Sequence, residues 1–247
     1  LGNGALGAML SGGIEEDVLQ LNLDSLWSGD MNLERGARSM GRYQSLGELR
    51  ILLEKAPRQP DFYRRELDLA RALHTVVIKA GGTSQIRTAY ISAPDQVLVY
   101  SIFSSQPLTG RIVLEDSRQG MVYHENGISK RLGTRYEGQD ILLDGLLPRQ
   151  LKYLDAAKKW REMKFGVTSG DMLYAVRIRV SGDGVVASEE KALRFRDCRK
   201  LTLLLVGDTT YEQNPASKFR NPDKLKRLPE RLVKAAAAGE SELRKRH

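Results

Sequence analysis

The sequence predicts a mainly β protein, an antiparallel β-sandwich followed by a helical linker at its C-terminal end. Short stretches of alternating apolar and polar residues recur along the chain, and turn residues separate them about every 8–12 residues. Strands and helices do not alternate, which argues against a parallel α/β sheet. The 247 residues are enough to bury one large β core.

The first expected element is a β-hairpin near the N-terminus. Glycines at 2, 4 and 7 have the spacing of a dinucleotide-binding loop, and Asp24 lies about 20 residues further on. Such a loop needs a strand before it and a helix after it. Here Gly12 and Gly13 soon interrupt the chain, and residues 18–23 alternate as in a strand. We therefore expect sheet at this position and no bound nucleotide.

The next elements are also expected to be strands. The same alternation favours a hairpin around Gly81 and Gly82. Residues 151–165 break the pattern, and periodicity does not decide there between a short helix and a decorated loop. The expected strands lie at 46–53, 73–79, 85–91, 96–103, 110–115, 121–125, 140–143, 172–180, 184–187, 192–196 and 200–206.

Residues 222–247 have a helical composition. Four alanines precede Gly239, which we expect to interrupt the helix. The apolar stripe of this helix is predicted to hold Leu225, Leu228, Leu232 and Val233. This pattern divides the chain into a β-sandwich domain, 1–217, and a helical linker, 218–247, that leads toward a further domain.

The basic charge of the chain is concentrated in this last segment. Residues 218–247 hold ten Lys/Arg and four Asp/Glu, so they carry +6 of the net +8, with Phe219 as the one aromatic. A nucleic-acid surface needs basic residues across a folded face and aromatics for stacking, so we expect no nucleic-acid partner. Neither a membrane span nor a signal peptide is predicted. The sequence does not determine the cellular compartment, and a secreted or periplasmic parent protein is compatible with the sequence.

The usual chemical motifs are missing. Cys198 is the one cysteine and lies in a predicted strand, so we expect a half-buried, inert thiol. His74, His124 and His247 lie far apart, without metal-ligand spacing. The sequence has neither a phosphate-binding loop nor a nucleophile elbow. We therefore expect no metal and no cofactor in this chain. Carboxylates are plentiful, but the sequence alone does not pair an acid with a base across strands.

Residues 20–29, QLNLDSLWSG, form the distinctive segment. Asn22, Asp24 and Trp27 place an amide, a carboxylate and an indole at the end of a strand. This set suits a sugar, because the polar groups bind hydroxyls and the flat ring accepts the C–H face. The alternative is that Asn22 and Asp24 satisfy loop backbone and that Trp27 fills a seam between domains. The sequence leaves both readings open.

Several ordered motifs carry a resemblance to a known family. They lie at 2–9, 12–13, 20–29, 43–49, 63–69, 93–97 and the final Leu243-x-x-x-His247. Together they resemble the N-terminal domain of glycoside hydrolase family 95, the α-L-fucosidase family. Leu23 differs, because an acid is usual there, and the stretch 31–42 is shorter than in the family.

The resemblance implies a large antiparallel β-sandwich of the supersandwich type, followed by a helical linker and an (α/α)6 barrel. In that family the acid and base of the inverting hydrolysis lie in the barrel, so no catalytic residue is transferred to this chain. We therefore expect a non-catalytic N-terminal domain of a glycoside hydrolase, with an oligosaccharide substrate bound through the downstream barrel. The alternative is a stand-alone carbohydrate-binding or assembly module, and the downstream reading frame would distinguish the two.

Overall fold

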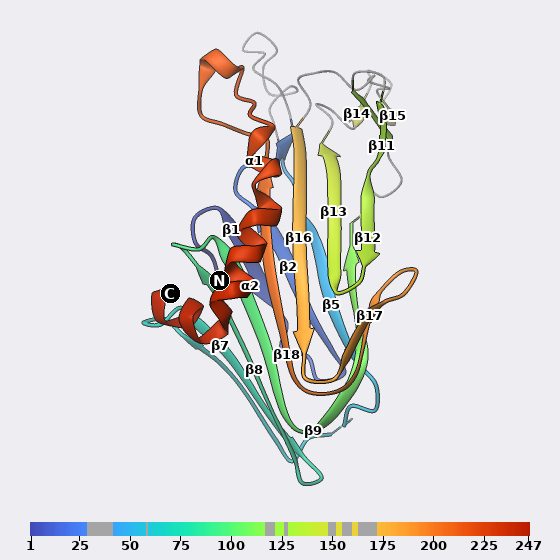
Figure 1. Ribbon diagram of the computed structural model, residues 1–247, viewed down its shortest axis with the longest axis vertical. Coiled ribbons are helices and arrows are strands. Elements are labelled where there is room, and N and C mark those ends of the chain that lie inside the picture. The colour runs from blue at the N-terminus through green and yellow to red at the C-terminus, as the bar shows by residue number, and fades with distance from the viewer. Residues whose placement is uncertain are drawn as a thin grey trace.

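The computed structural model describes residues 1–28, 42–57, 59–116, 122–125, 128–147, 152–154, 160–162 and 172–247 (Figure 1). The fold is mainly β, as predicted. The strands are β1 Leu6–Leu10, β2 Glu16–Leu23, β3 Trp27–Ser28, β4 Arg42–Tyr43, β5 Gly47–Leu53, β6 Phe62–Asp68, β7 Leu73–Ala80, β8 Thr83–Ser92, β9 Val97–Glu115, β10 Val122–Glu125, β11 Ile128–Arg131, β12 Gly133–Glu137, β13 Asp140–Leu147, β14 Lys152–Leu154, β15 Trp160–Glu162, β16 Met172–Gly182, β17 Val185–Ser188 and β18 Leu193–Thr209. A 3-10 helix at Pro215–Ser217 precedes the helices α1 Asp223–Lys226 and α2 Leu228–Arg246.

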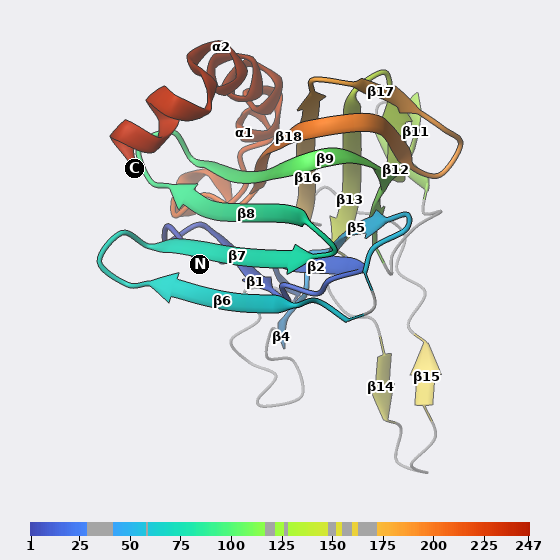
Figure 2. The ribbon, with the colours of Figure 1, turned by 90° about the horizontal axis from the view of Figure 1, so that it is seen from below.

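Two long strands, β9 and β18, connect the two layers of the sandwich. The first half of β9 pairs with β8, and its last residues pair with β5. β18 runs antiparallel to β9 through both halves. One layer therefore runs β6-β7-β8-β9-β18-β16-β13-β12, and the other runs β1-β2-β5-β9-β18-β17. Figure 2 shows β6, β7, β8 and β9 as successive neighbours of the first layer.

These long strands correct two predictions. The expected strands at 96–103 and 110–115 are one strand, β9, and those at 192–196 and 200–206 are one strand, β18. Residues 105–109 occupy the stretch of β9 between its pairing with β8 and its pairing with β5, so the strand continues through the gap between the two expected strands. In β18 the register shifts beside Cys198, as in a β-bulge, which lets one strand bend between layers.

The main core lies between the layers. Leu19, Leu21 and Leu23 of β2 point into it, as their alternation predicts, and are at most 2% exposed. In β9 the apolar run Val97–Ile102 is buried on both faces. Leu98 and Tyr100 face the main core, whereas Val97 and Val99 belong to a second core on the outer side. This double burial explains why the run does not alternate.

Helix α2 covers the outer face of the first layer, in front of β18 in Figure 1. Leu228, Leu232, Ala235 and Leu243 are the buried side chains of this helix. Gly239 has φ 75° and ψ 160°, so the predicted interruption is confirmed. Val233 was placed in the apolar stripe, and this was wrong, because the side chain is 54% exposed.

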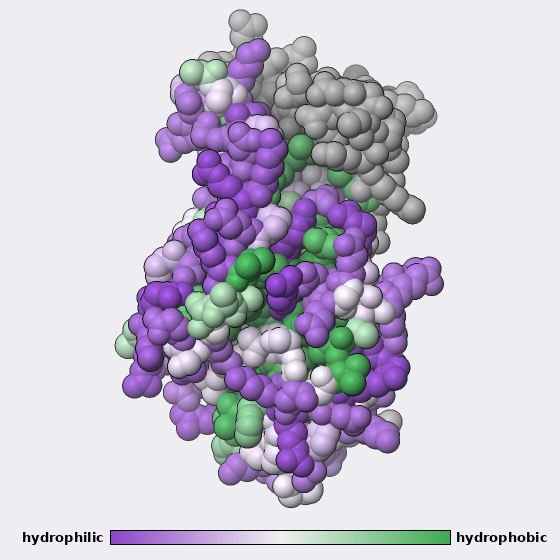
Figure 3. Space-filling model, in the orientation of Figure 1, coloured by the Kyte–Doolittle hydropathy of each residue, from purple (hydrophilic) through white to green (hydrophobic). Residues whose placement is uncertain are grey.

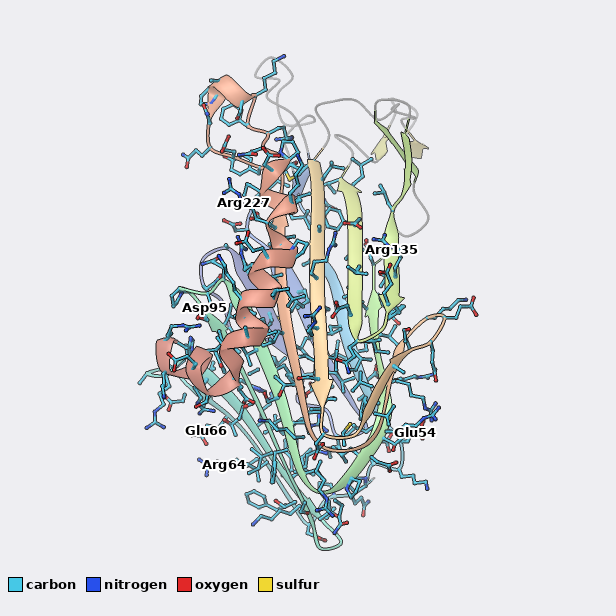
Figure 4. The ribbon with its side chains drawn as sticks, in the orientation of Figure 1. Glu54, Arg64, Glu66, Asp95, Arg135 and Arg227 are labelled. Atoms are coloured by element: carbon cyan, nitrogen blue, oxygen red, sulfur yellow. The ribbon has the colours of Figure 1, made fainter. Side chains whose placement is uncertain are left out.

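Polar contacts also hold the end of α2 against the sheet. Arg246 forms an ion pair with Asp95 at 2.8 Å, and the His247 ring stacks on Tyr90 with centroids 4.7 Å apart. Figure 4 shows Asp95 beside the last turns of the helix. The helix is thus packed on the sandwich through its whole length. The division after residue 217 stays a prediction.

Several elements carried no clear signal in the sequence. β6 is missed because most of its residues are exposed and charged, and β12 alternates over only five residues. Within 151–165 the described residues form β14 and β15, which pair with each other, and the other residues of that segment lie outside the described part. No helix among the described residues has the length and apolarity that crossing a membrane requires.

Candidate functional site

The predicted site lies just after β2, where the chain makes a tight turn. The turn is fixed by backbone bonds, in which Asp24 N donates to Ala5 O at 2.9 Å and Leu26 N to Leu23 O at 3.1 Å. The Leu26 side chain is fully buried and anchors the turn from below. Ser25 Oγ lies 2.7 Å from Thr209 Oγ1, which ties the turn to the end of β18. Because β18 ends beside the start of β16, the turn lies at the upper end of Figure 1.

Trp27 follows this anchor and remains 50% exposed. Its indole Nε1 donates to the backbone oxygen of Asp24 at 3.0 Å. The polar atom of the ring is therefore already satisfied, and the ring is held in one orientation before any ligand arrives. A large aromatic ring that is fixed and half in solvent offers its apolar face for binding.

Tyr43 is the residue that the sequence reasoning missed. It lies opposite Trp27 in the β3–β4 pair, and the two ring centroids are 5.6 Å apart with planes tilted by 59°. Tyr43 is 44% exposed. Burial of the phenol and then the negative charge of Asp24 raise the pKa of Tyr43, so its hydroxyl stays protonated and the Asp24 charge lies near it.

The structure therefore brings Asp24 and Trp27 together and adds Tyr43. The Asp24 side chain is exposed and makes no hydrogen bond or ion pair with the described residues. Asn22 lies two residues earlier on β2, half-buried, and its side chain forms no hydrogen bond within the described part. Carboxylate oxygens accept from hydroxyl groups, and an amide both donates and accepts. These groups can bind a polyhydroxylated ligand.

The other end of β2 holds a buried polar cluster, which we define as Ser11, Gly12, Asp17, Arg87 and Tyr100. Asp17 is 1% exposed and accepts four hydrogen bonds. Its Oδ1 accepts from Gly12 N at 2.8 Å and from Ser11 Oγ at 3.1 Å. Its Oδ2 accepts from Tyr100 OH at 2.7 Å and from Arg87 Nη1 at 3.2 Å. A carboxylate with all its lone pairs used is a structural group.

Arg87 closes the loop between β1 and β2 from the opposite layer. Its guanidinium donates to Gly13 O, to Ile14 O at 3.0 Å and to Gln85 Oε1 at 2.6 Å. Tyr63 and Arg65 of β6 bind the same loop through Gly12 O and Ser11 O. The loop between β1 and β2 is therefore clamped between the layers.

Gly12 is required at this clamp. Its φ is +68°, and a Cβ there would lie 2.9 Å from Arg65 Cδ and 3.0 Å from the Tyr63 hydroxyl oxygen. His74 lies nearby, and its buried Nε2 has no hydrogen-bond partner. Burial lowers the pKa of His74, although Asp17 acts in the opposite direction.

A cleft of about 590 Å³ opens at this same end, away from Trp27. It lies where β5 ends and β9 changes layers, and Figure 4 shows Glu54 on this lower part of the molecule. Ile14, Leu53, Gln85, Gln106 and Pro107 are among its lining residues. None of the predicted site residues contributes to it. Figure 3 shows that the face bearing α2 is mostly hydrophilic, with separate small apolar areas.

Cys198 was expected to be half-buried, but its position in the strand buries it completely, and its inertness stays a prediction. Cys198 is 1% exposed in β18, its Sγ lies 3.4 Å from Arg196 O, and burial raises the pKa of the thiol. No group of three metal-ligating side chains occurs among the described residues.

Comparisons with known proteins show which proteins this chain is similar to. "Alpha-L-fucosidase 2" of Arabidopsis thaliana is 25% identical over 251 residues, covering 86% of this chain and 28% of that protein. "Probable alpha-fucosidase A" of Aspergillus niger is 32% identical over 143 residues, covering 44% of this chain and 18% of that protein. The chain thus spans less than a third of either relative. A solved "Putative kojibiose phosphorylase from human microbiome" has a TM-score of 0.49 and 12% identity, covering 96% of this chain and 34% of that one.

The family is given by a sequence model that covers most of the chain. The model described as "Glycosyl hydrolase family 65, N-terminal domain" matches residues 1–41 and 32–214. The general expectation of a glycoside hydrolase N-terminal domain is therefore confirmed, whereas the specific resemblance to family 95 stays a prediction. The chain belongs to the family of glycosyl hydrolase family 65 N-terminal domains.

Proposed function

We propose that this chain is the non-catalytic N-terminal domain of an inverting α-L-fucosidase-like glycoside hydrolase that acts on fucosylated glycans. In this proposal residues 218–247 lead toward a downstream (α/α)6 barrel that supplies the catalytic acid and base. The domain's own contribution is at the rim of the sugar cleft, through Asn22, Asp24 and Trp27. The names of the two fucosidase relatives support the substrate class.

The observation that carries the proposal is the state of the turn after β2. Trp27 is half exposed although its indole N–H is already bonded to Asp24 O. Beside it, the Asp24 carboxylate has no partner among the described residues. A fixed ring and a free acceptor side by side fit a hydroxylated ligand.

In the whole enzyme, a carboxylic acid of the barrel would protonate the leaving oxygen, and a base-activated water would attack the opposite face of the sugar. The residues of this chain would orient the sugar and exclude water from one side of it. A loss of this orientation lowers turnover, because the reacting atoms no longer meet in line.

The test compares Trp27→Ala with Phe103→Ala in an enzyme restored to full length. Phe103 is also an exposed aromatic, at 59%, but it lies on β9, away from the turn. We expect Trp27→Ala to lower kcat/KM by about tenfold or more while Tm changes little. Phe103→Ala leaves kcat/KM unchanged. Unchanged turnover in Trp27→Ala would assign the indole to packing, and hydrolysis of a fucoside by these 247 residues alone would contradict a non-catalytic domain.

The second candidate is a carbohydrate-binding or assembly module that works without a barrel. The same free carboxylate and fixed indole favour it, because they can bind a glycan on a stand-alone domain. Binding of a glycan by a protein whose reading frame stops shortly after His247 would support this module and exclude the first proposal.

A further inference from the structure

Tyr43 gives the turn after β2 a second aromatic surface, which neither the sequence motifs nor the relatives assign. Trp27 and Tyr43 are directly opposed across two antiparallel strands, so their side chains lie on the same face of the ribbon. Both rings remain close to half exposed. Two adjacent exposed aromatics of this size on a fixed backbone are unusual unless something covers them.

The angle between the rings decides what shape they can hold. With planes tilted by 59° and centroids 5.6 Å apart, Trp27 and Tyr43 do not form one flat platform. They form a corner with two apolar walls. A sugar ring lying on one wall therefore places a substituent against the other.

Asp24 contributes the polar groups that lie beside this corner. Trp27 Nε1 is already bonded to Asp24 O at 3.0 Å, so the indole offers no free donor. The free acceptor is the Asp24 carboxylate, whose charge lies close enough to Tyr43 to act on its phenol. Hydroxyl groups of a ligand are therefore drawn toward Asp24, and the part of the ligand without hydroxyls faces the rings.

We infer that Tyr43 is a second sugar-contacting residue and that the Trp27–Tyr43 corner takes the methyl-bearing side of a 6-deoxyhexose. A methyl group buries apolar surface against the second ring. A hydroxymethyl group packed against the ring face would lose water from its hydroxyl without gaining a partner, because the carbon face of the ring neither donates nor accepts. The inference rests on the proposed function, because it takes the turn to be a sugar site, and it adds the group that the site distinguishes.

The test titrates the 247-residue chain with methyl α-L-fucopyranoside and with methyl α-L-galactopyranoside, which carries a hydroxymethyl group instead. The sequence has two tryptophans, so 5-fluorotryptophan labelling gives two ¹⁹F signals, and Trp27→Phe assigns the one at the site. We expect the Trp27 signal to shift with the fucoside at about millimolar Kd, and with the galactoside at a Kd about fivefold higher or more.

Three variants separate the corner from other effects. Tyr43→Leu should weaken fucoside binding and abolish the preference, because the second ring is gone. Tyr43→Phe keeps the ring and should keep the preference, which guards against a loss caused by misfolding. Phe103→Leu, at an exposed aromatic outside the turn, should leave both Kd values unchanged.

Two results would overturn the inference. One is a Trp27 signal that neither sugar moves at concentrations of tens of millimolar. The other is equal binding of the two sugars, or a preference that survives Tyr43→Leu. Neither result bears on the proposed function, which is tested separately by the turnover of the Trp27→Ala enzyme. If that turnover is unchanged while the methyl preference is found, the proposed catalytic role fails and the sugar site remains.

Discussion

Each end of β2 carries an aspartate, and the two side chains differ in burial and in hydrogen bonding. Asp17, at the start of the strand, is 1% exposed and bound by four donors from both layers. Asp24, one residue past the end and roughly 24 Å away, is exposed and without a partner among the described residues. One end of the strand closes the sandwich, and the other end is left open to solvent.

This difference means that the Asp17 end of β2 stabilises the fold, whereas folding leaves the Asp24 side chain free for the proposed sugar site. A buried carboxylate is stable only when every donor around it is retained, so the cluster at Asp17 cannot vary freely. An exposed carboxylate contributes little to folding, so the turn at Asp24 can be shaped by what it binds. Substitutions at the two ends should therefore have different readouts.

The largest effect is expected for Asp17→Asn. The amide nitrogen would face either Gly12 N and Ser11 Oγ or Tyr100 OH and Arg87 Nη1, all of which are donors, and the buried guanidinium would lose its counter-charge. We expect a loss of about 3–5 kcal/mol in the free energy of unfolding, measured by urea denaturation. A loss below about 1 kcal/mol would show that the cluster tolerates rearrangement and would remove the contrast between the ends.

Two glycine-to-alanine substitutions test the same contrast. Gly12 and Gly81 both have positive φ, but a Cβ on Gly81 would meet nothing within 4 Å. Gly81→Ala should therefore cost only the backbone strain, about 1 kcal/mol. Gly12→Ala adds the clash with Arg65, Tyr63 and Val76 and should cost about 2–3 kcal/mol. Equal melting temperatures of the two variants would show that the loop is not clamped.

A smaller effect, dependent on pH, is expected from His74. Because its folded pKa is lowered below 6.5, the unfolded state takes up the proton first as pH falls. The stability that neutral His74 contributes is therefore present above about pH 6.5 and decreases below it. Asp17, Arg65 and the N-terminal amine are the charged groups that act on it.

We expect His74→Leu to stabilise the chain relative to the natural residue, because the unpartnered buried Nε2 is removed. The gain should be larger at about pH 5.5 than at about pH 8, as measured by thermal unfolding in matched buffers. A gain that does not change with pH would assign the effect to packing alone.

The smallest effect on folding is expected at the open end. Asp24→Asn should change the free energy of unfolding by about 0.5 kcal/mol or less, because no ion pair is lost. Sugar binding should weaken instead, since a charge-assisted hydrogen bond becomes a neutral one. The measurement is the fucoside titration described above, beside a urea curve. A large loss of stability would mean that both ends of β2 are structural.

Much of the fold was predictable because it rests on local patterns. Alternation at 18–23 and the turn at Gly81–Gly82 each determine a hairpin without distant contacts. The continuity of β9 and β18 was not predictable, since polar residues such as Gln106 and Asp197 look like loop until both partner strands are placed. The length of these two strands is determined by pairing with segments that are distant in the sequence.

The site was predictable only in part, for a similar reason. Asp24 and Trp27 are three residues apart, so one turn brings them together. Tyr43 reaches them through a strand pair that no local pattern marks. Likewise, Arg87 interrupts an apolar strand, and only its distant partner Asp17 explains its presence.

The sharing of β9 and β18 by both layers has a mechanical consequence. In a sandwich built from separate sheets, one sheet can slide or peel away while the other keeps its hydrogen bonds. Here any shear between the layers pulls along the two continuous strands β9 and β18. Tension applied to one layer is therefore passed directly to the other layer. The domain is thus built as a stiff block, on which the turn at Trp27 keeps a fixed position relative to helix α2.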